Sequence, residues 1–193
     1  DKGNNVGSKY SFRMSPEVFP ALKETGFDVL SFANNHVGDW NVSAFTDTLE
    51  RASSTEIIIT GAGKTKAKAS KVSIIEKNGT KFGFLAFSDV GPVWIKAGES
   101  SPGILLLADP SLSQIISEAK IEVDVLIVSI HWGDEYKEYN ERQQEYAHKI
   151  IDSGADLIIG HHPHVIQGTE KYKDGLIFYS LGNFIFDQKF SEE

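Results

Sequence analysis

The fold is most clearly indicated by the stretch Val123-Asp124-Val125-Leu126-Ile127-Val128-Ser129-Ile130-His131-Trp132-Gly133, a nearly continuous apolar, β-branched run that ends at a histidine. Such a run is typical of a central strand in a sheet that is covered on both faces. A second buried run, Asp156–Gly160, is followed directly by His161-His162-Pro163-His164. Because ligands bind at the carboxyl ends of the strands in open α/β sheets, the two runs predict a site at one sheet edge.

Short apolar runs and helical patterns alternate on both sides of this stretch. We expect strands over residues 28–33, 56–60, 71–76, 81–87, 123–130, 156–160, 176–180 and 183–186. We expect helices over residues 16–25, 43–52, 110–121 and 140–153, the first with Ser15 as its N-cap. Asn78-Gly79 between two alternating runs predicts a β-hairpin. The pattern predicts an α/β fold with a layered, mixed sheet.

The composition excludes several classes of protein. A chain of 193 residues with 40% hydrophobic and 24% charged residues is expected to form a single globular domain over residues 1–193. Its net charge of −8 argues against a nucleic-acid partner and against adhesion to anionic lipid. The absence of cysteine excludes disulfides and thiolate metal sites. No apolar run is long enough to span a membrane.

Five of the six histidines follow directly on predicted strands. His36 follows the strand over 28–33, His131 ends the central strand, and the remaining three lie after the strand over 156–160. The sixth, His148, falls inside a helical pattern, where we expect a solvated side chain. Neutral imidazoles and amide oxygens suit Zn²⁺, Mn²⁺ or Fe²⁺, so the five histidines indicate a divalent metal site.

Two other features leave alternatives open. Gly61-Ala62-Gly63-Lys64-Thr65 looks like part of a phosphate-binding loop, but Ile58 stands where that pattern requires glycine. The lysines at 64, 66, 68 and 71 then form either a solvated loop or a basic lip for an anionic substrate. Asp134 and Glu135 either orient a ligand imidazole or begin a solvated segment over residues 134–145.

Four motifs, in the right order, resemble the bacterial capsule-synthesis CapA family, which includes poly-γ-glutamate biosynthesis proteins. The motifs are Phe32-Ala33-Asn34-Asn35-His36 with Asp39, His131-Trp132-Gly133-Asp134-Glu135-Tyr136, Gly154-Ala155-Asp156-Leu157-Ile158-Ile159-Gly160-His161-His162-Pro163-His164 and Tyr179-Ser180-Leu181-Gly182-Asn183-Phe184. This resemblance implies the calcineurin-like metallophosphoesterase fold, a four-layered α/β/β/α sandwich with mixed sheets and a two-metal site at the strand ends.

The resemblance also implies roles for individual residues. The metal ligands would be Asn35, His131, His162 and His164, and the ions Mn, Zn or Fe. His36 would be the general acid, and Asp39 of the same motif joins it as a catalytic residue. The last motif has one histidine more than the Gly-His-x-His of the family, so His161 remains an alternative to His162.

The sequence departs from the family pattern at its beginning and its end. The family opens with a Gly-Asp strand and an Asn-x-Glu motif that supply carboxylate ligands, and neither occurs before Phe12. We therefore expect a chain truncated at both ends, with an exposed strand edge. We expect two divalent ions in a full-length parent and one or none in this chain. A smaller departure is Trp40-Asn41, where the family has an aromatic residue and then glycine.

The resemblance implies a capsule or poly-γ-glutamate biosynthesis protein that hydrolyses phosphoesters with the help of metal ions. One alternative is a non-hydrolytic accessory factor for synthesis or export of that polyanion, and another is an amide hydrolase acting on the polymer. The partners would be an anionic polymer or phosphoester substrate and the membrane-bound capsule polymerase. The parent protein would be extracytoplasmic and membrane-associated at the bacterial cell surface.

Overall fold

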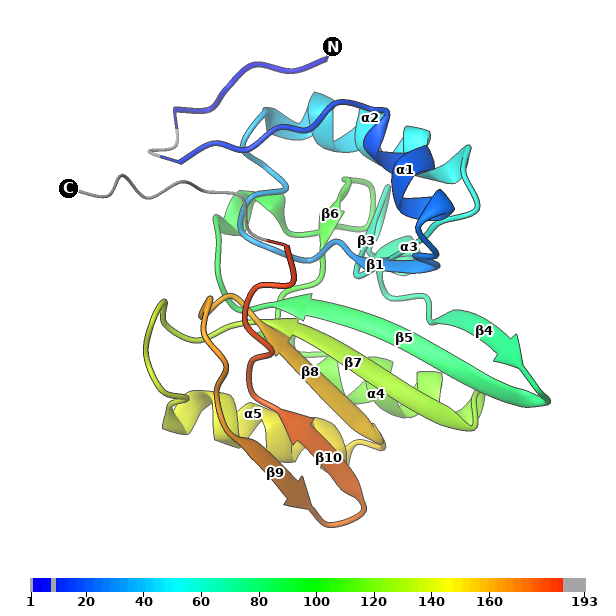
Figure 1. The fold of residues 1–193 in the computed structure, drawn as a ribbon, viewed down its shortest axis with the longest axis vertical. Helices are drawn as coiled ribbons and strands as arrows, with labels where there is room; N and C mark the ends of the chain where they lie inside the picture. The colour runs from blue at the N-terminus through cyan, green and yellow to red at the C-terminus, as the bar shows by residue number, and fades with distance from the viewer. Residues whose placement is uncertain (1, 8–9, 186–193) are drawn as a thin grey trace.

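A six-stranded mixed sheet forms the centre of the computed structural model, which describes residues 2–7 and 10–185 (Figure 1). In order across the sheet the strands are β4 (Ser73–Lys77), β5 (Thr80–Ser88), β7 (Val125–His131), β8 (Leu157–His161), β10 (Gly175–Phe178) and β9 (Thr169–Tyr172). The four inner strands run parallel, and β4 and β9 are antiparallel edge strands. The apolar run around Val125 is therefore a central strand, as predicted.

The two faces of β7 explain why this strand positions the site. Leu126, Val128 and Ile130 are fully buried and face a layer of two helices, α4 (Leu112–Ile121) and α5 (Glu141–Asp152). Helix α4 packs on β5 and β7, and α5 packs on β8. Because side chains alternate along a strand, His131 projects from the opposite face of the sheet. The helix layer thus fixes the strand, while the histidine at its end faces the second sheet layer.

The second layer consists of two short sheets. β1 (Val29–Ser31) pairs in parallel with β2 (Ile58–Thr60), and β3 (Ala62–Gly63) pairs with β6 (Gly103–Ile104). Outside them lie α1 (Val18–Glu24) and α2 (Asn41–Ser53), while α3 (Lys66–Ala69) follows β3. Figure 1 shows the resulting α/β/β/α order of layers, which agrees with the predicted fold class. In the described part of the chain, the inner layer next to α1 and α2 consists of two separate two-stranded sheets and not of one continuous sheet.

Several local predictions hold. The Asn78-Gly79 hairpin connects β4 and β5, and both residues have positive φ angles of 55° and 78°. Asn41, in the position where the family has glycine, has a φ angle of 66°. This left-handed conformation is the one that glycine adopts most readily and that asparagine tolerates. Helix α5 begins after Asn140, whose side chain accepts a hydrogen bond from the backbone of Gln143 in a capping box.

Two predicted elements differ in the structure. Helix α1 begins at Val18, later than predicted, and its N-cap position is Glu17, which makes no side-chain cap. The Ser15 carbonyl accepts a hydrogen bond from the Val18 amide, so Ser15 and Pro16 form a turn before the helix. Residues 183–185 form no strand, and residue 186 lies outside the described residues. Just before this segment, Leu181 forms a single antiparallel bridge to Ile166.

The lysine-rich segment is not a simple solvated loop. Lys66 begins α3, and its ammonium group lies 2.8 Å from a carboxylate oxygen of Asp109. Lys96 approaches the second oxygen of Asp109 at 3.4 Å, and the Asp109 side chain is almost fully buried. The segment is therefore fastened to the core through a buried carboxylate. Within residues 2–7 and 10–185, no helix has both the length and the apolar character needed to cross a membrane.

Candidate metal centre

The carboxyl ends of β1, β7 and β8 bring the predicted ligand residues together. Asn35 follows β1, His131 ends β7, and His162 and His164 lie in the loop after β8. The imidazole rings of His131 and His162 have centroids 4.7 Å apart, and those of His162 and His164 are 6.0 Å apart. The four side chains therefore form one group, although they come from three separate parts of the chain.

Asn35 links two histidines through its carboxamide. Its Oδ1 lies 2.8 Å from Nε2 of His131, and its Nδ2 lies 3.2 Å from Nε2 of His36. Neighbouring donors in an octahedral shell with bonds of about 2.1 Å are about 3 Å apart. The Asn35–His131 separation is thus close to that of two ligands of one ion.

The orientation of His36 is set by Asp39. Nδ1 of His36 lies 2.9 Å from Oδ2 of Asp39, whose side chain is almost fully buried. The backbone amide of Phe12 donates to the same oxygen at 3.0 Å, and the Phe12 ring contacts the imidazole edge-on at 4.6 Å. Because Nδ1 is engaged by Asp39, Nε2 of His36 is turned toward Asn35. The predicted catalytic pair is therefore in direct contact.

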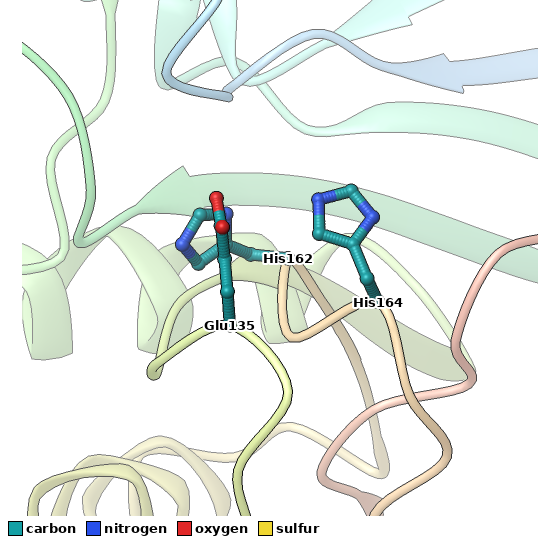
Figure 2. A group of neighbouring side chains, drawn as sticks. All are labelled: Glu135, His162 and His164. Atoms are coloured by element: carbon teal, nitrogen blue, oxygen red, sulfur yellow. The ribbon is translucent and has the colours of Figure 1, made fainter. Parts of the chain in front are cut away.

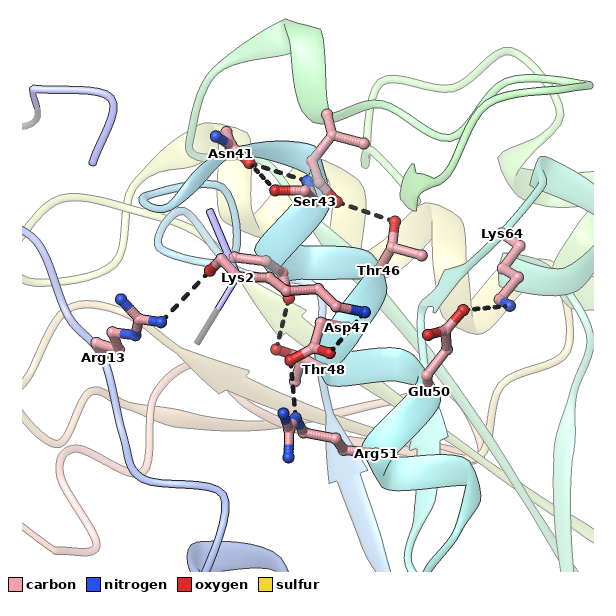
Figure 3. A network of polar contacts seen from close by, with 12 residues as sticks. Lys2, Arg13, Asn41, Ser43, Thr46, Asp47, Thr48, Glu50, Arg51 and Lys64 are labelled. Carbon is pink, nitrogen blue, oxygen red and sulfur yellow. Dashed lines mark hydrogen bonds and ion pairs between the residues drawn. The ribbon is translucent and has the colours of Figure 1, made fainter. Parts of the chain in front are cut away.

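The amino-terminal segment that carries Phe12 is attached to α2 (Figure 3). Lys2 forms an ion pair with Asp47 at 3.2 Å, and Arg51 binds the same carboxylate at 2.7 Å. Arg13 donates to the Lys2 carbonyl at 3.4 Å and lies over the Trp40 ring at 4.5 Å. These contacts hold Phe12 beside His36.

An apolar pocket of about 330 Å³ opens beside His36, between the amino-terminal segment, α1 and α2. Its aromatic lining includes Phe12, Phe32, Trp40 and Phe45, and His36 forms part of its wall. An apolar group of a bound ligand would therefore lie next to the His36 imidazole.

The loop after β8 is held in a strained conformation. His162 and His164 have backbone φ angles of 99° and 61°, which residues other than glycine rarely adopt. Within β8, just before the loop, a Cβ on Gly160 would overlap the Tyr179 carbonyl oxygen, which accepts a hydrogen bond from the Trp132 indole at 2.8 Å. Such strain persists only where the surrounding packing enforces it, and it is frequent at functional sites.

The structure shows which of the two adjacent acidic residues, Asp134 and Glu135, lies near the histidines. Donor atoms of Glu135, His162 and His164 all lie within 4.8 Å of one another (Figure 2). Asp134 instead faces Lys137, at 3.8 Å, on the exposed side of the loop. Glu135 is therefore the carboxylate that belongs to the histidine group.

Burial keeps several of these imidazoles neutral. It lowers the pKa of His131 to about 2, with a smaller contribution from the neighbouring histidines. Burial also lowers the pKa of His161 and His162, and in His162 the carboxylates of Glu135 and, more weakly, Asp134 partly oppose the effect. A neutral imidazole is the form that binds metal ions, so these side chains are prepared for that role.

Comparison with known proteins places the chain in a family. The sequence pattern described as "Bacterial capsule synthesis protein PGA_cap" matches residues 1–188. The chain belongs to this family. It is 43% identical over 175 residues to the PGA biosynthesis protein CapA of Bacillus subtilis, covering 89% of the chain and 46% of that protein. It is 38% identical over 195 residues to the capsule biosynthesis protein CapA of Bacillus anthracis, covering 97% and 47%.

The PGA_cap chain spans about half the length of the curated relatives it matches. A third relative, from Mycobacterium tuberculosis, bears the name "Probable polyglutamine synthesis accessory protein" and is 29% identical over 91% of the chain and 50% of its own length. A crystal structure of a hypothetical protein from Thermus thermophilus shares the fold, with a TM-score of 0.59 and 17% identity. That likeness covers 88% of the chain and 59% of the other protein.

The remaining histidines of the PGA_cap chain lie in other surroundings. His161 pairs in register with His131, and its carbonyl accepts a hydrogen bond from the Trp132 amide. It is not part of the Glu135–His162–His164 group, which favours His162 over His161 as the partner of His164. His148 is half-buried, not fully solvated, because it bonds Glu170 at 2.8 Å on the helix side of the sheet.

Asn183 belongs to the fourth sequence motif, but the sequence pattern alone indicates no role for it. The Asn183 Oδ1 lies 2.7 Å from Nδ1 of His164. Metal-binding histidines usually donate their second ring N–H to such an oxygen, which fixes the tautomer. The donor set of amide oxygen, neutral imidazoles and one carboxylate therefore fits a divalent transition-metal ion.

Proposed function

We propose that this PGA_cap chain carries the metal-dependent hydrolytic site of a capsule or poly-γ-glutamate biosynthesis protein, and that the site cleaves phosphoester bonds. The observation that carries the proposal is the meeting of Asn35, His36 and His131 with the histidine loop after β8 at one sheet edge. General-acid and metal-ligand residue types stand there in direct contact. This is the combination that hydrolysis of a phosphoester requires.

Four residues would hold the ions, namely Asn35, His131, His162 and His164. Bound divalent ions supply Lewis acidity, which polarises a phosphoryl oxygen and acidifies water. The neutral imidazoles of His131 and His162 need not lose a proton before they bind, because burial lowers the pKa of each. The charge of −8 on the chain makes the ions the natural attachment point for an anionic substrate.

His36 is the proposed general acid. Its Nδ1 donates to Asp39, so its Nε2 faces the group of ligand residues. When both ring nitrogens carry a proton, His36 can deliver the Nε2 proton to the leaving oxygen. Asp39 acts by positioning this imidazole. The apolar pocket beside His36 gives the leaving group of the substrate a place to lie.

The test is phosphoester turnover by the protein in its natural length. Aryl phosphate monoesters and diesters are assayed with Mn²⁺ or Zn²⁺ added, in the wild type and in His162→Ala. We expect His162→Ala to lower turnover by at least about 100-fold. The control is His148→Ala, whose histidine bonds Glu170 on the other face of the sheet, and which should retain turnover. Equal turnover in His162→Ala and the wild type would contradict the proposal.

A second candidate is a non-hydrolytic accessory factor for poly-γ-glutamate synthesis or export. It is favoured by the name "Probable polyglutamine synthesis accessory protein" of the mycobacterial relative. In this role the ions would bind the carboxylates of the polymer, at the outer face of the membrane and beside the capsule polymerase. The same site could also cleave the amide links of the polymer. Binding of metal and polymer without turnover of phosphoester or amide would favour the accessory role.

A further inference from the structure

The loop after β7 contributes a carboxylate to which the family resemblance gives no role. Donor atoms of Glu135, His162 and His164 lie within 4.8 Å of one another, and in Figure 2 the His162 ring lies behind the Glu135 carboxylate, with the His164 ring beside them. Glu135 belongs to the loop after β7, whereas both histidines belong to the loop after β8. Because two loops contribute, the grouping results from the tertiary fold and not from local spacing.

The two loops are fastened to each other next to these side chains. The backbone amide of Tyr136 donates to the Pro163 carbonyl at 2.8 Å. The Tyr136 ring also stacks on the His164 ring, with centroids 5.9 Å apart and an angle of 25° between the planes. Glu135 directly precedes Tyr136, so its backbone is held at a fixed place relative to both histidines.

Asn183 orients the third member of the group. It accepts a hydrogen bond from Nδ1 of His164 at 2.7 Å, so Nε2 is the nitrogen directed toward a ligand. An outer carboxamide of this kind fixes the tautomer of a metal-binding histidine and raises its basicity. This contact fixes the tautomer and the orientation that His164 needs as a metal ligand.

We infer that Glu135, His162 and His164 bind one divalent transition-metal ion, so that Glu135 is a metal ligand of this chain. Two imidazoles and one carboxylate form a ligand set of hydrolytic zinc sites, which keep a fourth position open. Bonds of about 2.1 Å place such donors roughly 3–4 Å apart. The Glu135 side chain is exposed, so it has room to turn toward an ion held by the two imidazoles.

This inference deepens the proposed function and rests on it, since it places an ion at the same sheet edge. The His162 ring neighbours donors of both sets, because its centroid lies 4.7 Å from that of His131, which contacts Asn35, and 6.0 Å from that of His164. Two-metal hydrolases hold their ions about 3.5–4 Å apart. Glu135 would supply a carboxylate ligand to one of the two ions, the one bound by His162 and His164.

The test is zinc binding by the 193-residue chain, measured by isothermal titration calorimetry with Zn²⁺ alone. Glu135→Gln keeps the shape of the side chain and removes its charge. Asp134→Asn is the matched control, because it removes the same charge from the neighbouring residue. We expect Glu135→Gln to weaken zinc affinity at least about tenfold, or about 1.4 kcal/mol, and Asp134→Asn to stay within about twofold of the wild type.

Two further measurements keep the result interpretable. Thermal melts of the metal-free variants should match the wild type, because Glu135 is exposed. Ring ¹⁵N shifts of His162 and His164 should move when Zn²⁺ is added to the wild type. The inference is overturned if the wild type binds no Zn²⁺, or if the two variants bind it equally well.

Failure of the inference and failure of the proposed function give different results. Zinc binding that depends on Glu135, in a protein of natural length that turns over no phosphoester, upholds the inference and rejects the hydrolase. Phosphoester turnover with zinc affinity unchanged in Glu135→Gln rejects the inference and upholds the hydrolase.

Discussion

The side-chain oxygen of Asn35 lies 2.8 Å from Nε2 of His131, although 96 positions separate the two residues in the sequence. This contact joins the loop after β1 to the end of the central strand, and thus joins the two sheet layers. Asn35 also contacts His36, and the ring of His131 lies beside His162 of the loop after β8. His36, the proposed general acid, and the proposed ligands Asn35 and His131 are in this way parts of one hydrogen-bonded group.

The first prediction concerns the positioning of His36. Asp39→Asn replaces the carboxylate that holds Nδ1 of His36, so the imidazole loses its fixed orientation. We expect kcat for phosphoester hydrolysis to fall at least about tenfold with little change in KM, and His36→Ala to lower kcat by about 10²–10⁴. The check is steady-state kinetics together with ¹⁵N shifts of the His36 ring. An unchanged tautomer and unchanged kcat in Asp39→Asn would contradict this role.

The second prediction concerns Gly160 in β8, just before the histidine loop. Gly160→Ala places a Cβ against the Tyr179 carbonyl and the Trp132 indole, both of which are buried. We expect a loss of about 1–3 kcal/mol in the free energy of unfolding, together with weaker zinc binding. Gly79→Ala is the control, since its Cβ would meet open space and only the positive φ angle opposes it. Denaturant titration should show the larger loss for Gly160→Ala; the reverse order would contradict the packing argument.

The third prediction concerns Trp132, which is fully buried and donates to the Tyr179 carbonyl at 2.8 Å. Trp132→Phe removes this donor and leaves a small cavity. We expect a loss of about 2–4 kcal/mol in unfolding free energy. Trp94→Phe is the matched control, because Trp94 is 48% exposed and the same change should have little effect. Thermal unfolding compares the two, and similar losses would show that the burial of Trp132 has been misjudged.

The fourth prediction concerns the pH dependence of stability at Asp109. Burial acts to raise the pKa of Asp109, but the Lys66 ammonium and the Ser111 amide outweigh it and hold that pKa below its usual range. The folded state therefore favours the carboxylate, and its stabilising effect is complete above about pH 4 and is lost as the pH falls through the folded pKa.

Asp109→Asn tests this dependence. We expect the variant to lose about 1–3 kcal/mol at pH 7 and to approach the stability of the wild type in acid. Urea titrations at several pH values between 2 and 7 measure the difference. A difference that stays constant, or grows as the pH falls, would contradict the assignment.

Much of the fold follows from local patterns in the sequence. The apolar runs around Leu126 and Ile158 are long, β-branched and flanked by turns, so their strands and their parallel arrangement are predictable. The hairpin at Asn78-Gly79 is predictable because its two residues adopt the left-handed conformation that such a turn needs. These elements depend on conformational preferences that residues express locally.

Other features depend on contacts that the sequence does not display. β9 is a short polar strand, and it is formed because β10 offers it an edge to pair with. Ser15 loses its expected capping role because the chain turns before α1. Glu135 and Asp134 have the same chemistry and adjacent positions, and only the folded structure shows that Glu135 is the one whose donor atoms lie near the histidines.

The central claim, that this sheet edge is a divalent metal centre, is tested most directly by metal content. The 193-residue chain and His162→Ala are loaded with Zn²⁺, dialysed against metal-free buffer, and analysed by inductively coupled plasma mass spectrometry. Because His162 is a ligand of the ion inferred at Glu135, His162 and His164, we predict that the wild type retains zinc at about one equivalent and that His162→Ala retains almost none. Equal zinc content in the two proteins, or none in either, would contradict the account.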